Sequence, residues 1–172
     1  MTSLWRLHIR PKGGLSDPRF SVDFCLRQGV VGMGWGVAGS GVARSTDFAW
    51  YKTAAVETYG GDTSWHSVRA FAEEAKEGDL VWFRDFLGRY YIAELTGPWE
   101  YCWEGDHIGA DIINLRRARI VVVGLADAGP GRIIASFIPP KCFQPIRMAG
   151  MLAFTEKLAG TRVDETTTGG PV

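Results

Sequence analysis

The sequence has little of what marks secreted, metal-binding or membrane proteins. Only three cysteines occur in 172 residues. They are odd in number and widely spaced, which favours reduced thiols over a disulfide framework. The longest apolar run, 120–123, is followed only by Gly124-Leu125-Ala126 and is too short to span a bilayer. The N-terminus lacks the apolar core and cleavage site of a signal peptide. These absences predict a cytoplasmic protein with no membrane partner.

The chain also lacks net charge, with 19 Lys and Arg against 19 Asp and Glu. This balance argues against a purely electrostatic, non-specific binder of nucleic acid. The charges are unevenly placed, because two basic segments, 1–56 and 107–147, flank the acidic segment 57–106. The pattern predicts a cationic face on the folded molecule, and scattered solvated charges are the alternative.

Length and composition predict one domain. A chain of 172 residues that is 46% hydrophobic can bury a core of its own. We expect a single domain over 1–160. Residues 161–172 are polar, which predicts a disordered tail or a linker to a further domain.

Capping signals and hydrophobic periodicity predict a mixture of helices and strands. At 18–28, Asp17-Pro18 starts a helix and Gly29 ends it, although Phe20, Val22, Phe24 and Leu26 also alternate like a strand. Further helices are predicted at 46–59, capped by Ser45 or Thr46, and at 64–77 and 148–158. Strands are predicted at 4–10, 30–35, 80–84, 89–95, 114–123 and 133–137. The order of elements favours an α+β domain around a curved or closed sheet.

The segment 63–85 combines a helix, a glycine stop and a strand. Ser64 is a candidate N-cap, and Val68, Phe71, Ala72 and Ala75 follow helical spacing. After Gly78, the strand 80–84 carries Trp82 and Arg84. Free backbone N–H groups at the helix start, beside an exposed aromatic strand, suit a planar polar ligand such as a nucleobase.

Three weaker patterns point away from enzymes and metal sites. Gly34–Gly39 reads G-x-G-x-x-G, but no helix opens directly from it, so we interpret it as a loop that lets a ligand approach the backbone beside Trp35. Cys102 and His107 have no second pair of ligands at zinc-site spacing. Asp85 and Glu94 are expected to face each other across a hairpin, as a solvated pair. We therefore predict no catalytic residues, no metal and no cofactor.

Tryptophans near strand ends and turns are the stronger indication of a binding site, with core packing as the alternative. We expect Trp35, Trp65 and Trp82 to stack on a base and form pocket walls, since stacking contributes roughly 1–3 kcal/mol per base. The hydrogen-bonding residue would be Ser67, and the cations that meet phosphate or base would be Arg10, Arg69 and Arg84. Arg117 and Arg119 share one face of a strand and are candidate phosphate contacts, with protection of an exposed edge as the alternative.

Several motifs together resemble the PUA-like superfamily. They are LWRLHIRP at 4–11, GVVGMGWG at 29–36, WHSVR at 65–69, KEGDLV at 76–81 and YIAELTG at 91–97. The set is similar to the EVE domain and to the N-terminal domain of some methyl-directed restriction endonucleases, over residues 4–146. Ser67 and Ala70 differ from the glycine and asparagine of the EVE motif.

This resemblance implies a mostly antiparallel PUA-like β-barrel flanked by helices. It also implies non-catalytic recognition of a modified base, in DNA more than RNA, with a fused or separate nuclease as effector. The alternative is a free-nucleotide sensor or a protein-interaction module that uses the same pocket.

Overall fold

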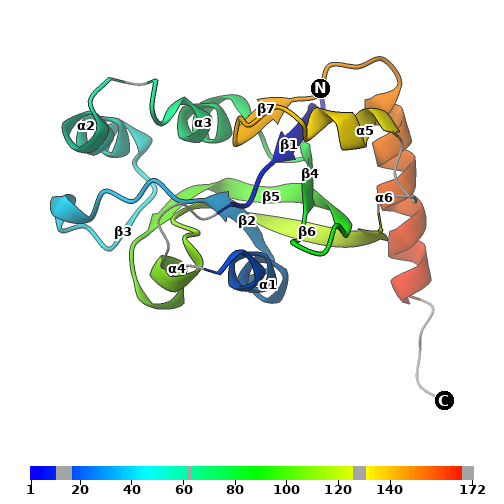
Figure 1. Cartoon of the computed structure of the whole chain (residues 1–172), viewed down its shortest axis with the longest axis horizontal. Coiled ribbons are helices and arrows are strands. Elements are labelled where there is room, and N and C mark those ends of the chain that lie inside the picture. Colours follow the sequence, from blue (N-terminus) through cyan, green and yellow to red (C-terminus); the bar gives the residue numbers. More distant parts are fainter. Residues whose placement is uncertain (11–16, 62, 126–130, 168–172) are drawn as a thin grey trace.

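The computed structural model describes residues 1–10, 17–61, 63–125 and 131–167. These residues form an α+β fold around one mixed sheet (Figure 1). Its strands are β1 Leu4–Leu7, β2 Val30–Met33, β3 Arg44–Ser45, β4 Leu80–Arg84, β5 Tyr90–Cys102, β6 Asn114–Gly124 and β7 Phe143–Pro145. The helices are α1 Pro18–Gln28, α2 Phe48–Tyr59, α3 His66–Arg69, α4 Gly105–Ala110, α5 Gly131–Ser136 and α6 Met151–Thr167, with a 3₁₀ turn η1 Ala38–Ser40 and a π turn η2 Ala70–Glu74.

The sheet is mostly antiparallel and runs in the order β2-β6-β5-β4-β1-β7, with β3 added beside β5. The pair β1–β4 is the parallel one. Strands β2 and β7 end the order, so the described strands do not close into a barrel. The predicted α+β class is confirmed at this level.

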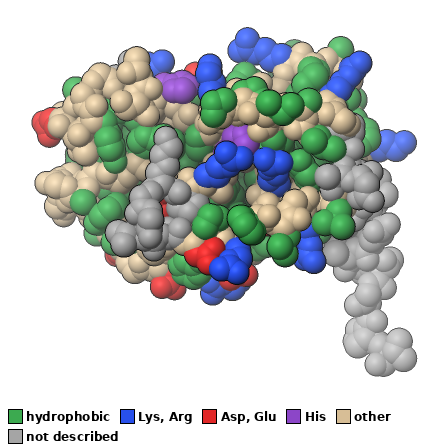
Figure 2. All heavy atoms as spheres, in the orientation of Figure 1, with side chains coloured by type: hydrophobic (Ala, Val, Ile, Leu, Met, Phe, Trp, Pro, Cys, Tyr) green, Lys and Arg blue, Asp and Glu red, His purple; other side chains and the backbone are tan. Residues whose placement is uncertain are grey.

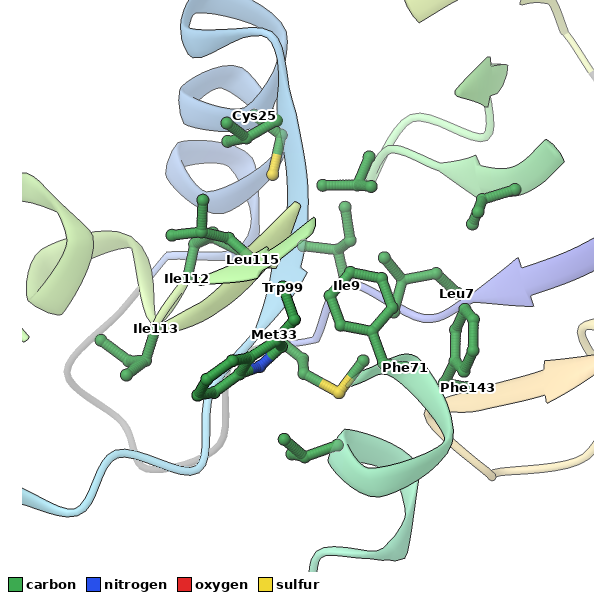
Figure 3. Close-up of a cluster of buried hydrophobic side chains, with 14 of the residues drawn as sticks. Leu7, Ile9, Cys25, Met33, Phe71, Trp99, Ile112, Ile113, Leu115 and Phe143 are labelled. Atoms are coloured by element: carbon green, nitrogen blue, oxygen red, sulfur yellow. The ribbon is translucent and has the colours of Figure 1, made fainter. Parts of the chain in front are cut away.

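The sheet is covered on both faces, so it separates two hydrophobic clusters. Side chains alternate across a strand: in β4, Val81 and Phe83 join the larger cluster, whereas Leu80 and Trp82 join the smaller one. Figure 3 shows part of the larger cluster, where Phe71, Trp99 and Met33 meet from three segments that are far apart in the sequence. In Figure 1, α1 and α4 lie on one side of the sheet and α3 lies on the other.

Local signals placed some elements correctly. Helix α1 has the predicted bounds: the Asp17 carboxylate accepts from the Arg19 N–H at 2.9 Å, and Gly29 ends the helix in the left-handed region at φ 63°. The strand alternative for these residues is therefore wrong. Strand β4 also has the predicted bounds, 80–84. The long strand β5 passes through Gly97-Pro98 with a register irregularity between Leu95 and Trp99.

Other helix boundaries differ from expectation. The N-cap of α2 is Asp47, not Ser45 or Thr46, because its carboxylate accepts from the N–H groups of Ala49 and Trp50. Ser64 does not cap the next helix, which begins at His66 without a side-chain cap and ends at Glu74. Helix α6 continues to Thr167, beyond the predicted end at 158, and 168–172 lie outside the described residues.

The strand predicted at 133–137 is wrong, because Gly131–Ser136 form helix α5. Ile133 and Phe137 pack into the smaller cluster. An apolar run this short fits a buried strand and a buried helix equally well, and packing decided between them. A glycine-rich loop is also predicted from the sequence at 128–131, and it lies largely outside the described residues, since 126–130 are not described. Within the described part of the chain, no helix is both long and apolar enough to cross a membrane.

Candidate ligand-binding pocket

The loop that follows β2 is held in place by side chains from three other elements. Hydroxyl and amide groups donate to three consecutive carbonyls: Asn114 Nδ2 to Gly34 O, Tyr51 OH to Trp35 O at 2.8 Å and Tyr59 OH to Gly36 O at 2.6 Å. The N–H of Val37 donates to Tyr101 OH at 3.0 Å. Hydrogen bonds on successive peptide groups leave this loop little conformational freedom, so we describe it as preorganised.

The glycines on either side of Trp35 make room for two other side chains. A Cβ atom on Gly34 would lie 2.4 Å from Asp111 Oδ1, and one on Gly36 would lie 1.9 Å from the Trp103 ring. Both distances are far below contact, so only glycine lets the Asp111 carboxyl group and the Trp103 ring approach this backbone. Trp35 and Asp111 themselves have positive φ, 59° and 53°. Asp111 is the left-handed C-cap of α4, a common place for aspartate, whereas this conformation is uncommon for a bulky residue such as Trp35.

A cavity of about 360 Å³ opens beside this loop. It lies between the two edges of the sheet, since Gly32–Gly36 come from the β2 edge and Cys142 directly precedes β7. The segment His8–Arg10, which follows β1, lines the same space. The remaining lining residues are Ser21, Tyr59, Trp103, Asp111 and Ile112. Its volume falls within the range of roughly 300–1,000 Å³ that is typical of small-molecule sites.

The cavity offers aromatic surface and one carboxylate. Trp35 Nε1 donates to Ser64 O at 2.9 Å. Burial, with Tyr101 and Asp111 nearby, raises the pKa of Tyr59, whose hydroxyl donates to the loop. Among the lining residues that the structure describes, Asp111 supplies the carboxylate. A ligand in this space meets ring surface and a hydrogen-bond acceptor.

A second hollow, here called the arginine groove, continues from the cavity. It shares His8, Ile9 and Arg10 with the cavity and is also lined by Pro18, Arg84, Asp85, Phe86 and Gly88. Figure 2 shows Lys and Arg side chains close to a histidine near the middle of this face. Arg6 is fully buried and donates to the carbonyls of Pro139 and Lys141, while its Nε has no hydrogen-bond partner among the described residues.

The arginine groove is lined by two cations, Arg10 and Arg84, and by the carboxylate of Asp85. Within the described residues, Arg6, Arg10 and Arg84 form no ion pair. Burial lowers the pKa of Arg6 to about 10. Burial, together with Arg6 and Arg10, lowers the pKa of His8 to about 4, so its imidazole is neutral near pH 7. Its Nε2 lies 3.2 Å from the Pro139 carbonyl, which can only accept, so this nitrogen carries the proton. The groove therefore suits an anion.

The structure brings some of the predicted site residues together and leaves others in the core. Trp35 and Arg10 line the cavity, and Arg84 lines the groove. Trp65 is buried beside Tyr51, and Trp82 is buried in the smaller cluster with its Nε1 donating to Thr155 Oγ1 at 3.0 Å. Both tryptophans therefore pack in the core, which is the alternative that the sequence analysis gives for them.

Two further predicted residues also lie outside the cavity lining. Ser67 is buried at the start of α3, and Arg69 is half-buried. Neither lines the cavity or the groove. Tyr59, Trp103 and Asp111 were not predicted. The glycines on either side of Trp35 are consistent with close approach of other side chains, but the sequence does not say which side chains approach.

The three arginines of β6 have different surroundings. Arg116 is buried and donates to four backbone carbonyls, those of Phe71, Ala72, Ala75 and Gly97. Arg117 and Arg119 are exposed and form ion pairs with Glu100 at 3.6 Å and with Glu94. These two side chains line neither the cavity nor the groove.

Asp85 and Glu94 do not face each other across the hairpin, so this prediction is wrong. In the register of β4 and β5, Glu94 is opposite Leu80, whereas Asp85 lies at the turn and accepts from Tyr91 OH at 3.0 Å. Among the described residues, no group of three His, Cys, Asp or Glu side chains could hold a metal ion.

Comparisons with protein-family models, with curated proteins and with solved structures find no match for this chain. The functional argument accordingly rests on the chemistry of the cavity and the groove.

Proposed function

We propose that this protein recognises a modified nucleobase in nucleic acid, in DNA more than RNA, by holding the base in the cavity without chemical reaction. The observation that carries the proposal is the cavity itself: a preorganised loop, the rings of Trp35 and Trp103, and the Asp111 carboxylate, with unneutralised arginines next to it. A fused or separate nuclease would be a suitable effector for such a reader.

Each part of the cavity matches one part of a nucleotide. Aromatic rings stack on the flat face of any base, and stacking contributes roughly 1–3 kcal/mol. A carboxylate accepts hydrogen bonds, so Asp111 favours a base edge with an N–H donor, such as the amino group of cytosine or adenine. Arg10 and Arg84 would meet the phosphates outside the cavity.

We also propose that the fold is a PUA-like barrel. Two features support this finer assignment: the sheet is mostly antiparallel, and the cavity lies between its two edges, where a closed barrel would join.

The proposal is tested by titrating single-stranded oligonucleotides that differ in one base: cytosine, 5-methylcytosine, 5-hydroxymethylcytosine, adenine, N6-methyladenine and thymine. Tryptophan fluorescence reports binding, since Trp35 and Trp103 line the cavity. We expect one modified amino base to bind at least about tenfold more tightly than its plain counterpart, a difference of about 1.4 kcal/mol. Equal, weak binding to all six would reject the proposal.

Asp111→Asn tests the role of the carboxylate. The amide keeps the shape of the side chain but replaces one acceptor oxygen with a donor group, so binding of the preferred base should weaken about 10- to 100-fold. Asp106→Asn is the matched control, because Asp106 is exposed on α4 and does not line the cavity. If both variants bind as the wild type does, Asp111 does not contact the base.

The alternative function is a sensor of free nucleotides or a protein-interaction module that uses the same cavity. The observation that favours it is the net charge of zero, which gives weak long-range attraction to a polyanion. A sensor would be stabilised against heat by free nucleotides and not by oligonucleotides, which thermal unfolding in the presence of each would distinguish.

A further inference from the structure

The turn between β4 and β5 holds two large apolar side chains in solvent. Phe86 is 70% exposed and Leu87 is 69% exposed. Both are neighbours in sequence at the tip of the hairpin, which we call the apolar tip (Phe86 and Leu87). Single exposed apolar residues are common, but these two are adjacent, and Phe86 lines the arginine groove.

The apolar tip is held rigidly by its own turn. Asp85 Oδ1 accepts from the N–H groups of Leu87 and Arg89, at 2.8 and 2.9 Å. The N–H of Asp85 donates to Arg89 O at 2.9 Å, and Gly88 has φ 82°, which permits the tight turn. The turn therefore keeps both side chains projecting without any support from the core.

The apolar tip, the arginine groove and the cavity form one continuous surface. Phe86 lines the groove together with Arg10 and Arg84, and Arg10 also lines the cavity. The apolar tip, the two arginines of the groove and the cavity thus follow one another on the same side of the molecule.

We infer that the apolar tip is a wedge that enters a DNA duplex next to the base held in the cavity. This inference rests on the proposed function. A base inside a duplex must leave the stack before it can enter a cavity, which costs a few kcal/mol. Apolar side chains such as Phe and Leu lower that cost by filling the space between base steps. The occupant of the groove would be the duplex backbone, because Arg10 and Arg84 line the groove and form no ion pair within the described residues.

The test compares duplex and single-stranded DNA that carry the same preferred base. In the variant Phe86→Ser/Leu87→Ser, duplex affinity should fall about tenfold or more, while single-strand affinity should change less than about twofold, because a single strand has no stack to open. The conservative variant Phe86→Trp keeps a large ring at the tip and should bind the duplex as the wild type does. Val122→Ser is the matched control, since Val122 is also exposed but lies on β6 and does not line the groove.

A second readout reports base flipping directly. 2-Aminopurine placed opposite the preferred base should brighten when wild-type protein binds the duplex, and the double variant should lose that signal. If duplex and single-strand affinities both stay unchanged, or fall by the same factor, the wedge is overturned while the cavity proposal stands. If the wild type binds neither DNA, the proposed function has failed and the wedge fails with it. A tip that docks on another protein gives the first of these results.

Discussion

Arginines occupy two regions of this molecule, and their surroundings differ. At the groove, Arg6, Arg10 and Arg84 come from β1, the segment after it and β4, and none of them has a carboxylate partner within the described residues. On β6, Arg116 is satisfied by backbone carbonyls, and Arg117 and Arg119 are paired with glutamates. The arginines of β6 are close together in the sequence. The groove arginines are far apart in the sequence, but they share the lack of an ion pair within the described residues, which suits an anionic ligand.

The largest effect is expected from removing Arg116. Arg116→Ala would remove the donors of four backbone hydrogen bonds, three of them buried and one part-buried, and each buried group left unsatisfied costs about 1–3 kcal/mol before relaxation and water entry. We expect a loss of about 3–5 kcal/mol in the free energy of unfolding, measured by urea denaturation. Arg116→Lys should recover part of it. Arg117→Ala, on the same strand but exposed, is the control and should change stability by less than about 0.5 kcal/mol.

The next effect concerns the cavity loop. In Gly36→Ala the new methyl group would collide with the Trp103 ring, so we expect a loss of about 1–3 kcal/mol and weaker ligand binding. Gly39→Ala is the matched control from the same sequence motif, because a Cβ atom there meets nothing within 4 Å. Thermal unfolding of both variants is the measurement. Equal melting temperatures would show that Trp103 can move aside and that the loop is less constrained than we describe.

Acid should lower the free energy of unfolding because His8 takes up a proton. Its pKa of about 4 in the folded state lies below the usual 6.5, so the folded protein favours the neutral ring. The stabilisation is complete above pH 6.5 and is lost as the pH falls towards 4, by about 1–3 kcal/mol in total. His8→Gln keeps a donor for Pro139 and cannot take up the proton. Urea denaturation between pH 7 and 4.5 should show that the free energy of unfolding falls less steeply with pH in this variant than in the wild type. The same pH dependence in both proteins would show that protonation of His8 does not contribute.

The smallest effect tests the comparison directly. Arg10→Glu/Arg84→Glu should weaken oligonucleotide binding about tenfold and flatten its salt dependence, while Arg117→Glu/Arg119→Glu should change the affinity less than about threefold, because those arginines are already paired with glutamates. Salt titrations of both double variants provide the measurement. A larger effect of the β6 double variant would show that Arg117 and Arg119, and not the groove arginines, contact phosphate.

Elements with strong local signals could be predicted from the sequence. Helix α1 follows from Asp17, Pro18 and Gly29, and strand β4 follows from its position after Gly78. At the site, Trp35 and Arg10 were expected and do line the cavity. Trp65 and Trp82 were expected beside the ligand, but both are buried, since a tryptophan at a strand or helix end can point into the core or out of it.

The α+β class, the bounds of the best-capped elements and the glycine-rich loop around Trp35 could all be predicted from the sequence. Propensity, capping and glycine conformation are local properties, so a short stretch of chain carries them. By contrast, the packing of Asp111 and Trp103 against Gly34 and Gly36, and the pairing of some arginines with carboxylates, became known from the folded structure. These outcomes depend on which distant segments meet across the sheet, and no short stretch of chain contains that information.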